Sequence, residues 1–397
     1  MLKTLTRAES AGILFLILLV LIYAVGSLVL HFYMDSIYAL QFAGITVVGA
    51  LAFFLGWQVK IRARMPLLQL DVDQFILLLW VPFLIFAVVA WSTAEQIPLV
   101  AALGGADSET ISILREQFFK ARPGWQASFV YIHAILTGAL IPYSIAKAFF
   151  DHHRLRWALF LFFLFYCITF MEKAYFLKAM FPLIYLVFQG RIRLRIKPIQ
   201  LLAITFSILL LVTYFSGSRG EVMKPEDSDV FFSMNYAAAG PLQHLLWRSV
   251  AIPIITAVDS LRTFYETFGG EYFRGATTSV FSWLFGLKNI QFERAVFFAQ
   301  GGQNATETGS ANAVYLVEAF INWGYTGVVI ISFIAGALLR FMVISDDEPL
   351  KALWILFAMG LFVAGLVGIL FSNGFLLLFL MAFFVKIGKP KPVHQVR

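Results

Sequence analysis

Residues 11–32 read AGILFLILLVLIYAVGSLVLHF, a run without a Lys, Arg, Asp or Glu. The hydrocarbon core of a bilayer is about 30 Å thick and a helix rises about 1.5 Å per residue, so about twenty apolar residues span it. The run is too long and too uninterrupted for a cleaved signal peptide, and no small-residue cleavage site follows it. It predicts a transmembrane helix.

The composition extends this interpretation to the whole chain. Hydrophobic residues make up 60% and charged residues 13% of 397 positions, and 43 residues are Phe. These values exclude a water-soluble globule and indicate a polytopic membrane protein. The net charge of +7 lies largely in short loops between apolar runs, so it does not indicate nucleic-acid binding. The single cysteine, Cys167, excludes disulfides and thiolate metal sites as organising devices.

Apolar runs recur along the chain and predict about ten helices, so we expect an all-α polytopic membrane protein. The expected spans lie near 11–32, 37–57, 74–93, 126–147, 155–171, 174–189, 198–215, 314–343, 352–371 and 374–387. Seven spans and an outer loop, 94–125, fall in residues 1–215, a large periplasmic loop occupies 216–313, and three spans fall in 314–397. As a straight helix, 314–343 would be about 45 Å long, so its first turns are expected at the outer interface.

Basic residues gather in alternate connections between these runs, Arg191 and Lys351 among them, whereas the connections 33–36 and 372–374 carry no Lys or Arg. Basic loops stay on the cytoplasmic side during membrane insertion. We therefore expect both termini to be cytoplasmic and the two long loops to face the other side.

The two long loops are expected to fold. The larger is rich in aromatic residues and regains helical periodicity from Leu242 to Phe268, so it is expected to pack on the membrane face. The smaller holds an apolar stretch, 97–103, and a helical piece around Arg115, which could form a surface helix or a lid.

Basic residues near the outer face are candidate ligands for a pyrophosphate, because guanidinium groups bind phosphate oxygens in pairs. The candidates are Lys173, Lys178, Arg219, Arg248, Arg262, Arg274 and Arg294. Each has a structural alternative: Arg219 could anchor its helix at the lipid surface, Arg262 could pair with Asp259 three residues earlier, and the lysines could reach for lipid phosphate or solvent.

A polar stripe begins where the large loop re-enters the membrane. Asn312, Tyr315, Glu318 and Asn322 fall within about a 120° arc of one helix. A carboxylate at membrane depth is a candidate functional group, and Glu318 could act as a general base or form a salt bridge to a basic residue. His133 is the other titratable group at this depth, and a hydrogen bond to a neighbouring helix would also explain it.

The chain resembles the O-antigen polymerases, also called oligosaccharide repeat-unit polymerases. The resemblance rests on the many spans, the large outer loop, SGSRG at 216–220 and GSANAVYLVEAFINWGYTGVVIISFIAG at 309–336. A membrane-entering Glu followed by an Asn-aromatic-Gly-x-x-Gly element is matched by Glu318, Asn322, Trp323, Gly324 and Gly327. The Arg-x10-Gly spacing of some members is absent, so donor and acceptor loops are not assigned by it.

The resemblance implies an inverting, C-type glycosyltransferase that faces the periplasm of a bacterial inner membrane and uses neither metal, nucleotide nor other cofactor. It would join undecaprenyl-pyrophosphate-linked repeat units, with a lipid-linked donor and acceptor and a chain-length regulator as partners. Arg219, with Arg248, Lys173 and Lys178, would stabilise the leaving pyrophosphate, and Glu318 would take the proton from the attacking hydroxyl. The expected saccharide ligands are Asn312, Tyr315, Asn322, Trp323 and His133.

Two other functions stay open on the sequence. An O-antigen ligase would use the same donor but a lipid A core as acceptor. A lipid or solute transporter would line a path with the polar stripe, although such transporters often show internal repeats, and none is evident here.

Overall fold

A computed structural model describes residues 10–61, 65, 67–120, 122–171, 173–193, 197–217, 228–301 and 309–388. The chain is mostly helical, as expected. Its N-terminal part forms α2 (Ala11–Leu19), η2 (Val20–Val25), α3 (Gly26–Met34), α4 (Ile37–Trp57), α5 (Val72–Ser92), α6 (Pro98–Leu103), α7 (Ser108–Phe119), η3 (Gly124–Ser128), α8 (Phe129–Ile135), η4 (Leu136–Leu140), α9 (Ile141–Phe150), α10 (Arg156–Thr169), α11 (Lys173–Phe188) and α12 (Pro198–Gly217).

The remaining helices belong to the large loop and the C-terminal part. The loop forms α13 (Pro241–Leu246), η5 (Trp247–Ala251), α14 (Ile252–Glu266), α15 (Ser279–Leu284) and α16 (Phe292–Ala299). The C-terminal part forms α17 (Tyr315–Ile344), α18 (Glu348–Ala352), α19 (Trp354–Val363), α20 (Leu366–Phe371) and α21 (Phe375–Phe384). The expected helical periodicity of the large loop is confirmed by α13, η5 and α14, and that of the smaller loop by α6 and α7.

The helices are those of a membrane protein by length and composition. Within the described residues, five stretches are long and apolar enough to cross a bilayer: Ala11–Met34, Ile37–Trp57, Val72–Ser92, Gly124–Phe150 and Tyr315–Ile344. Large apolar side chains point away from the protein on several of them, with Leu51 64% and Leu77 65% exposed. Such faces are stable against lipid but not against water, and this agrees with a bilayer around the helices.

Two long helices, α4 and α17, pack with almost no space between their backbones. A Cβ atom at Gly56 would overlap the backbone carbonyl of Phe333, and one at Gly336 would overlap that of Phe53. Small residues permit such close approach of helices in lipid, where van der Waals packing rather than the hydrophobic effect drives association.

The span expected over 314–343 is present as α17, but it is not one straight helix, because the helix breaks at Gly324. This residue has φ 64° and ψ −153°, a region that only glycine occupies readily. Leu316 and Ser332 both lie beside Gly49 of α4, although 16 residues along one straight helix would separate them by about 24 Å. Residues 315–323 are therefore turned back against residues 325–344.

The two last expected spans also differ from a pair of continuous helices. The range 352–371 is broken at Ala364 and Gly365, which separate α19 from α20. The range 374–387 ends as a helix at Phe384 and continues as β2 (Val385–Ile387), which pairs in parallel with β1 (Leu68–Leu70) in the register Leu68 to Val385. Apart from this short ladder the described chain is helical or irregular, in agreement with the expected all-α class.

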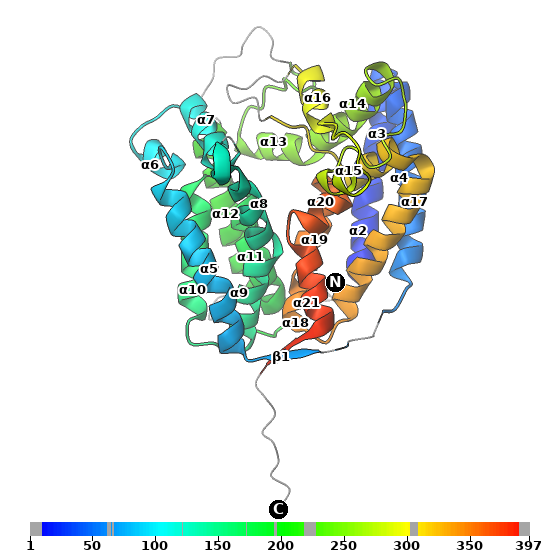
Figure 1. Ribbon diagram of the computed structural model, residues 1–397. Coiled ribbons are helices and arrows are strands. Elements are labelled where there is room, and N and C mark those ends of the chain that lie inside the picture. Colours follow the sequence, from blue (N-terminus) through cyan, green and yellow to red (C-terminus); the bar gives the residue numbers. More distant parts are fainter. Residues whose placement is uncertain are drawn as a thin grey trace, which may run out of the picture.

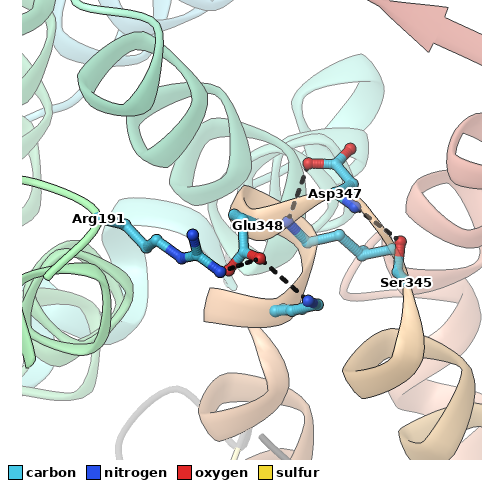
Figure 2. Close-up of polar contacts among 6 residues, drawn as sticks. Arg191, Ser345, Asp347 and Glu348 are labelled. Atoms are coloured by element: carbon cyan, nitrogen blue, oxygen red, sulfur yellow. Dashed lines mark hydrogen bonds and ion pairs between the residues drawn. The ribbon is translucent and has the colours of Figure 1, made fainter. Parts of the chain in front are cut away.

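The helices of the two long loops gather at one end of the molecule, here called the loop end, and β1, β2 and α18 lie at the opposite, strand end (Figure 1). At the strand end the Arg191 guanidinium lies 3.0 Å from the Glu348 carboxylate (Figure 2), and the Lys351 ammonium lies 3.0 Å from the same oxygen. Connections expected on one side of the membrane therefore do meet at one end of the protein.

Hydrogen bonds from Arg122 hold the smaller loop against the end of α5. Arg122 is 7% exposed and donates hydrogen bonds to the carbonyls of Ala90 at 2.7 Å and Phe118 at 2.6 Å, and to Thr93 Oγ1 at 2.5 Å. Two of these partners lie in the last turns of α5 and α7, where a cation is favourable. The C-terminal end of α7 is thus held against α5.

Candidate active site

A cavity of about 610 Å³ lies at the loop end, between the membrane helices and the large loop. Its walls come from α8, from residues 277–280 and 289–294 of the large loop, from the α20 region at 367–372, and from Glu318. The membrane helices contribute mainly apolar side chains, among them Tyr131, Ile135 and Phe371. The large loop contributes most of the polar side chains, mixed with apolar ones such as Ile290 and Phe292. A cavity with these two sides fits a ligand that is part lipid and part polar.

Glu318 reaches the cavity because two helices are interrupted beside it. It lies in the short first half of α17, before the break at Gly324. Its carboxylate sits against Gly365, where a Cβ atom would overlap the carboxylate, and it accepts a hydrogen bond from the backbone N–H of Val367. Non-helical backbone within a membrane protein is tolerated where it is packed against protein or lines a cavity. The break between α19 and α20 meets this condition, because Gly365 packs against Glu318 and lines a cavity.

Glu293, in the first turn of α16, shares the cavity with Glu318. Both acids also line a smaller cavity of about 30 Å³, together with Gly365 and Ser260. Glu293 lies close enough for its charge to act on Glu318. The Glu293 side chain is exposed to the solvent of the cavity, but the surrounding protein weakens its hydration, and this desolvation raises the pKa of Glu293 to about 7.

Sequence reasoning missed Glu293. It stands in the stretch Phe292-Glu-Arg-Ala-Val, which reads as an ordinary amphipathic helix with a solvated face. Nothing in its spacing relative to Glu318 indicates that the two meet.

Arg294 is the one cation among the described residues that line the cavity. It is half-buried, its guanidinium lies 5.5 Å from the Phe298 ring centre, and it donates a hydrogen bond to Gln291 Oε1 at 3.4 Å. The structure describes the side chains of five of the seven basic residues singled out from the sequence. Of these five, Arg294 is the one that lines the same cavity as Glu318.

The other described arginines lie outside this cavity. The Arg262 guanidinium lies 2.9 Å from the Asp259 carboxylate, and this confirms the expected structural pair. Arg274 is exposed in a left-handed turn at φ 52°, and its backbone N–H donates to the carbonyl of Asn322. Arg248 is exposed on η5, with its guanidinium 5.9 Å from the Trp247 ring.

Of the two lysines and Arg219, the structure describes only the side chain of Lys178. Lys178 lies on α11 with its ammonium 4.1 Å from the Tyr175 ring, and it does not line the cavity. Lys173 begins α11, but its side chain lies outside the described part of the structure, as does all of Arg219.

The saccharide ligands expected from the polar stripe also lie off the cavity wall. Tyr315 is fully buried, Trp323 is half-buried with its ring edge-on to Phe281 at 5.4 Å, and Asn312 is exposed just before α17 begins. His133 is 2% exposed, stacks on Phe119 at 4.1 Å and shares a hydrogen bond of 2.9 Å with the Tyr166 hydroxyl.

Asn322 is also fully buried and ties the large loop to α17. Its amide oxygen accepts from the Gly275 N–H at 2.8 Å, and its amide nitrogen donates to Thr277 Oγ1 at 2.7 Å and to the Glu318 carbonyl at 2.8 Å. These bonds satisfy the side chain within the protein and place Thr277 on the cavity wall. Its position in the stripe is therefore explained by the attachment of the loop.

The polar side of the cavity comes from residues that sequence analysis did not single out. They are hydroxyl and amide side chains of the large loop: Thr277, Thr278, Ser279, Asn289, Gln291 and Ser310. Such residues are common in any loop, so only their convergence on one cavity distinguishes them.

Within the residues that the structure describes, no three His, Cys, Asp or Glu side chains gather as metal ligands would. Comparisons with protein-family models, curated proteins and solved structures find no match to the chain. The chemistry of the cavity is therefore the basis for assigning a function.

Proposed function

We propose that the chain polymerises lipid-linked oligosaccharide repeat units, as an O-antigen polymerase does. The observation that carries the proposal is that Glu318 and Arg294 line one cavity of about 610 Å³ with an apolar and a polar side. A base, a cation and an amphipathic cavity are what this reaction requires. The sequence resemblance to the O-antigen polymerases supports the same assignment.

In this proposal the protein spans the bacterial inner membrane ten times, with both termini in the cytoplasm and the loop end in the periplasm. The alternation of basic connections supports that orientation, because Arg191 and Lys351 meet at the strand end. The other five crossings belong to the proposal: four are made by α10, α11, α12 and α21, and the fifth by α19 and α20 together.

The reaction is an inverting displacement at the anomeric carbon of the donor sugar. Glu318 takes the proton of the attacking hydroxyl on the acceptor unit, and the hydroxyl oxygen forms the new bond to the anomeric carbon. The bond between that carbon and the pyrophosphate oxygen breaks, and the electron pair leaves with undecaprenyl pyrophosphate. The proton on Glu318 then passes to water.

Arg294 stabilises the charge that develops on the departing pyrophosphate, since a guanidinium binds phosphate oxygens in pairs. Arg219, Arg248, Lys173 and Lys178 stay predictions for the same task, along with a chain-length regulator as a protein partner. Neither a metal nor a nucleotide takes part in this scheme, because cleavage of the sugar pyrophosphate bond supplies the driving force.

The test uses the purified protein in lipid vesicles with the lipid-linked units that a strain of the source bacterium accumulates when this gene is deleted. We expect ladders of joined units and release of undecaprenyl pyrophosphate. Glu318→Gln, Arg294→Ala and Arg219→Ala each remove the ladder, while Arg262→Ala, outside the cavity, keeps it. Ladders of ordinary length from Glu318→Gln would contradict the assignment.

A transporter of lipid or solute is the second candidate, because two interrupted helices meet at Glu318. Transporters often bind their substrates at such interruptions near the middle of the membrane. Movement of intact lipid-linked units across the vesicle bilayer, without release of undecaprenyl pyrophosphate, would favour this function. Transfer that occurs only when a lipid A core is added would instead identify a ligase.

A further inference from the structure

The cavity carries a second acid that the reaction scheme above does not use. Glu293 and Glu318 both line the small cavity of about 30 Å³ and the large cavity, and they lie close enough for their charges to interact. Among the described residues, neither forms a salt bridge. Two acids that face one space without a counter-ion indicate a ligand that donates hydrogen bonds to them.

Amide and hydroxyl side chains continue the wall from Glu293. Asn289 donates to Ser279 Oγ at 3.4 Å and to Ser282 Oγ at 3.2 Å, which leaves its amide oxygen as an acceptor toward the cavity wall. Gln291 accepts from Arg294, so its amide nitrogen is a donor. A wall of alternating donors and acceptors matches the hydroxyl groups of a sugar, each of which donates and accepts.

We infer that Ser279, Asn289, Gln291 and Glu293 form the subsite for the acceptor saccharide, and that this subsite takes an uncharged sugar. This inference rests on the proposed function, because it names the part of the acceptor substrate that the site binds. Glu293 binds a hydroxyl next to the attacking one and thereby presents the attacking hydroxyl to Glu318.

Charge decides which part of the substrates lies here. Above its pKa of about 7 Glu293 is ionised, and the pair of acids then disfavours a pyrophosphate or an acidic sugar but accepts hydrogen bonds from neutral hydroxyls. The cation Arg294 follows Glu293 directly on the same wall, and in this proposal it binds the donor pyrophosphate while the acids bind the acceptor sugar.

The first experiment asks whether saccharide occupies the wall. Carbodiimide with glycine ethyl ester labels accessible carboxylates of the protein in nanodiscs, and peptide mass spectrometry measures the labelling of Glu293. The probe is the repeat-unit oligosaccharide released from its lipid by mild acid. We expect the probe to protect Glu293 from labelling in proportion to its concentration. Glu271, an exposed acid of the same loop outside the cavity, is the internal control and stays labelled.

The second experiment asks what the wall contributes. We expect Glu293→Gln to raise the acceptor concentration at half-maximal rate by about 10- to 100-fold, as loss of a hydrogen bond to a charged group does. Asn289→Ala and Gln291→Ala raise it by about tenfold or less. Glu271→Gln, at an exposed acid of the same loop off the wall, leaves it unchanged. Thermal unfolding of each variant shows whether it folds, and Glu293→Asp, which keeps the charge, is expected to recover part of the affinity.

The outcomes separate this inference from the proposed function. If the protein joins units but the oligosaccharide does not protect Glu293, or Glu293→Gln leaves the acceptor dependence unchanged, the subsite is wrong and the polymerase stands. If units are not joined but the probe protects Glu293, the wall is a saccharide site of a different activity. An acidic sugar at the attacking end of the natural repeat unit would overturn the charge argument.

Discussion

The two halves of α17 have the same kind of sequence but different tasks. Residues 325–344 pack against α4 through Gly336, whereas residues 315–323 turn back and carry Glu318 into the cavity. One left-handed residue, Gly324, separates them. The comparison shows that a single apolar run can supply both a membrane-crossing helix and one wall of a site, provided that its backbone can reverse between them.

The packing half is the more sensitive to added volume, and we expect the largest effect there. Gly56→Leu forces a side chain into the backbone of Phe333 and is expected to cost about 3 kcal/mol or more, with loss of folded protein. Gly44→Leu is the matched control on the same helix, because a Cβ atom there meets nothing within 4 Å. Detergent-solubilised yield and thermal unfolding measure the difference, and equal behaviour of the two variants would disprove the close α4–α17 contact.

The junction between the halves is the next test. Gly324→Ala places a Cβ atom where φ is 64° and ψ is −153°, which costs about 1–3 kcal/mol and favours straightening of α17. Straightening withdraws Glu318 from the cavity, so we expect polymer formation to fall by about 10²-fold, while the 325–344 half still packs on α4. Ladder gels measure the activity and thermal unfolding the stability. Full activity in Gly324→Ala would mean that the break is not required.

The half of α17 that carries Glu318, residues 315–323, can be disturbed without changing its charge. Gly365→Ala introduces a methyl group that overlaps the Glu318 carboxylate, so we expect a loss of activity of about 10²-fold with little loss of folded protein. Gly368→Ala is the matched control, since it lies on the same cavity wall and its Cβ atom would meet nothing within 4 Å. If both variants polymerise alike, Glu318 does not act from its place beside Gly365.

The smallest effect is expected from the pH dependence of stability. Burial raises the pKa of Glu293 to about 7 from its ordinary 4.5, so between these values the folded protein holds this proton more tightly than the unfolded chain. Stability therefore falls slightly as the pH rises through that range and levels off above about pH 7. Thermal unfolding of the wild type and of Glu293→Gln from pH 4.5 to 8 measures it, and the slope due to this group is absent in the variant. A wild-type slope of the opposite sign that Glu293→Gln removes would show that Glu293 is paired with a cation.

Much of the fold could be predicted because it depends on local sequence. The apolar runs led to the helices, and the periodicity from Leu242 to Phe268 led to α13, η5 and α14. The reversal at Gly324 and the break at Gly365 could not be predicted, because glycine inside an apolar run is also compatible with a continuous helix. The short ladder between Leu68 and Val385 pairs residues from opposite ends of the chain, and neither stretch alone indicates a strand.

The candidate site was predictable only in part. Glu318 and Arg294 were singled out by residue type, and the structure places both on one cavity wall. The stripe residues Tyr315 and Asn322 were expected in the site but are buried within the protein, since helical periodicity says which side chains share a face and not what that face contacts. Glu293 was missed for the converse reason, because its partner lies on another element.

The sequence by itself determined that this is a helical membrane protein with a folded outer segment. A helix in lipid satisfies its backbone hydrogen bonds within one segment, so a run of apolar residues is enough to specify it. Only the tertiary structure decided that Glu293, Glu318 and Arg294 share a cavity and that Gly365 leaves room for the acid. Those contacts join residues far apart in the chain, and their geometry follows from how the helices and the loop pack together.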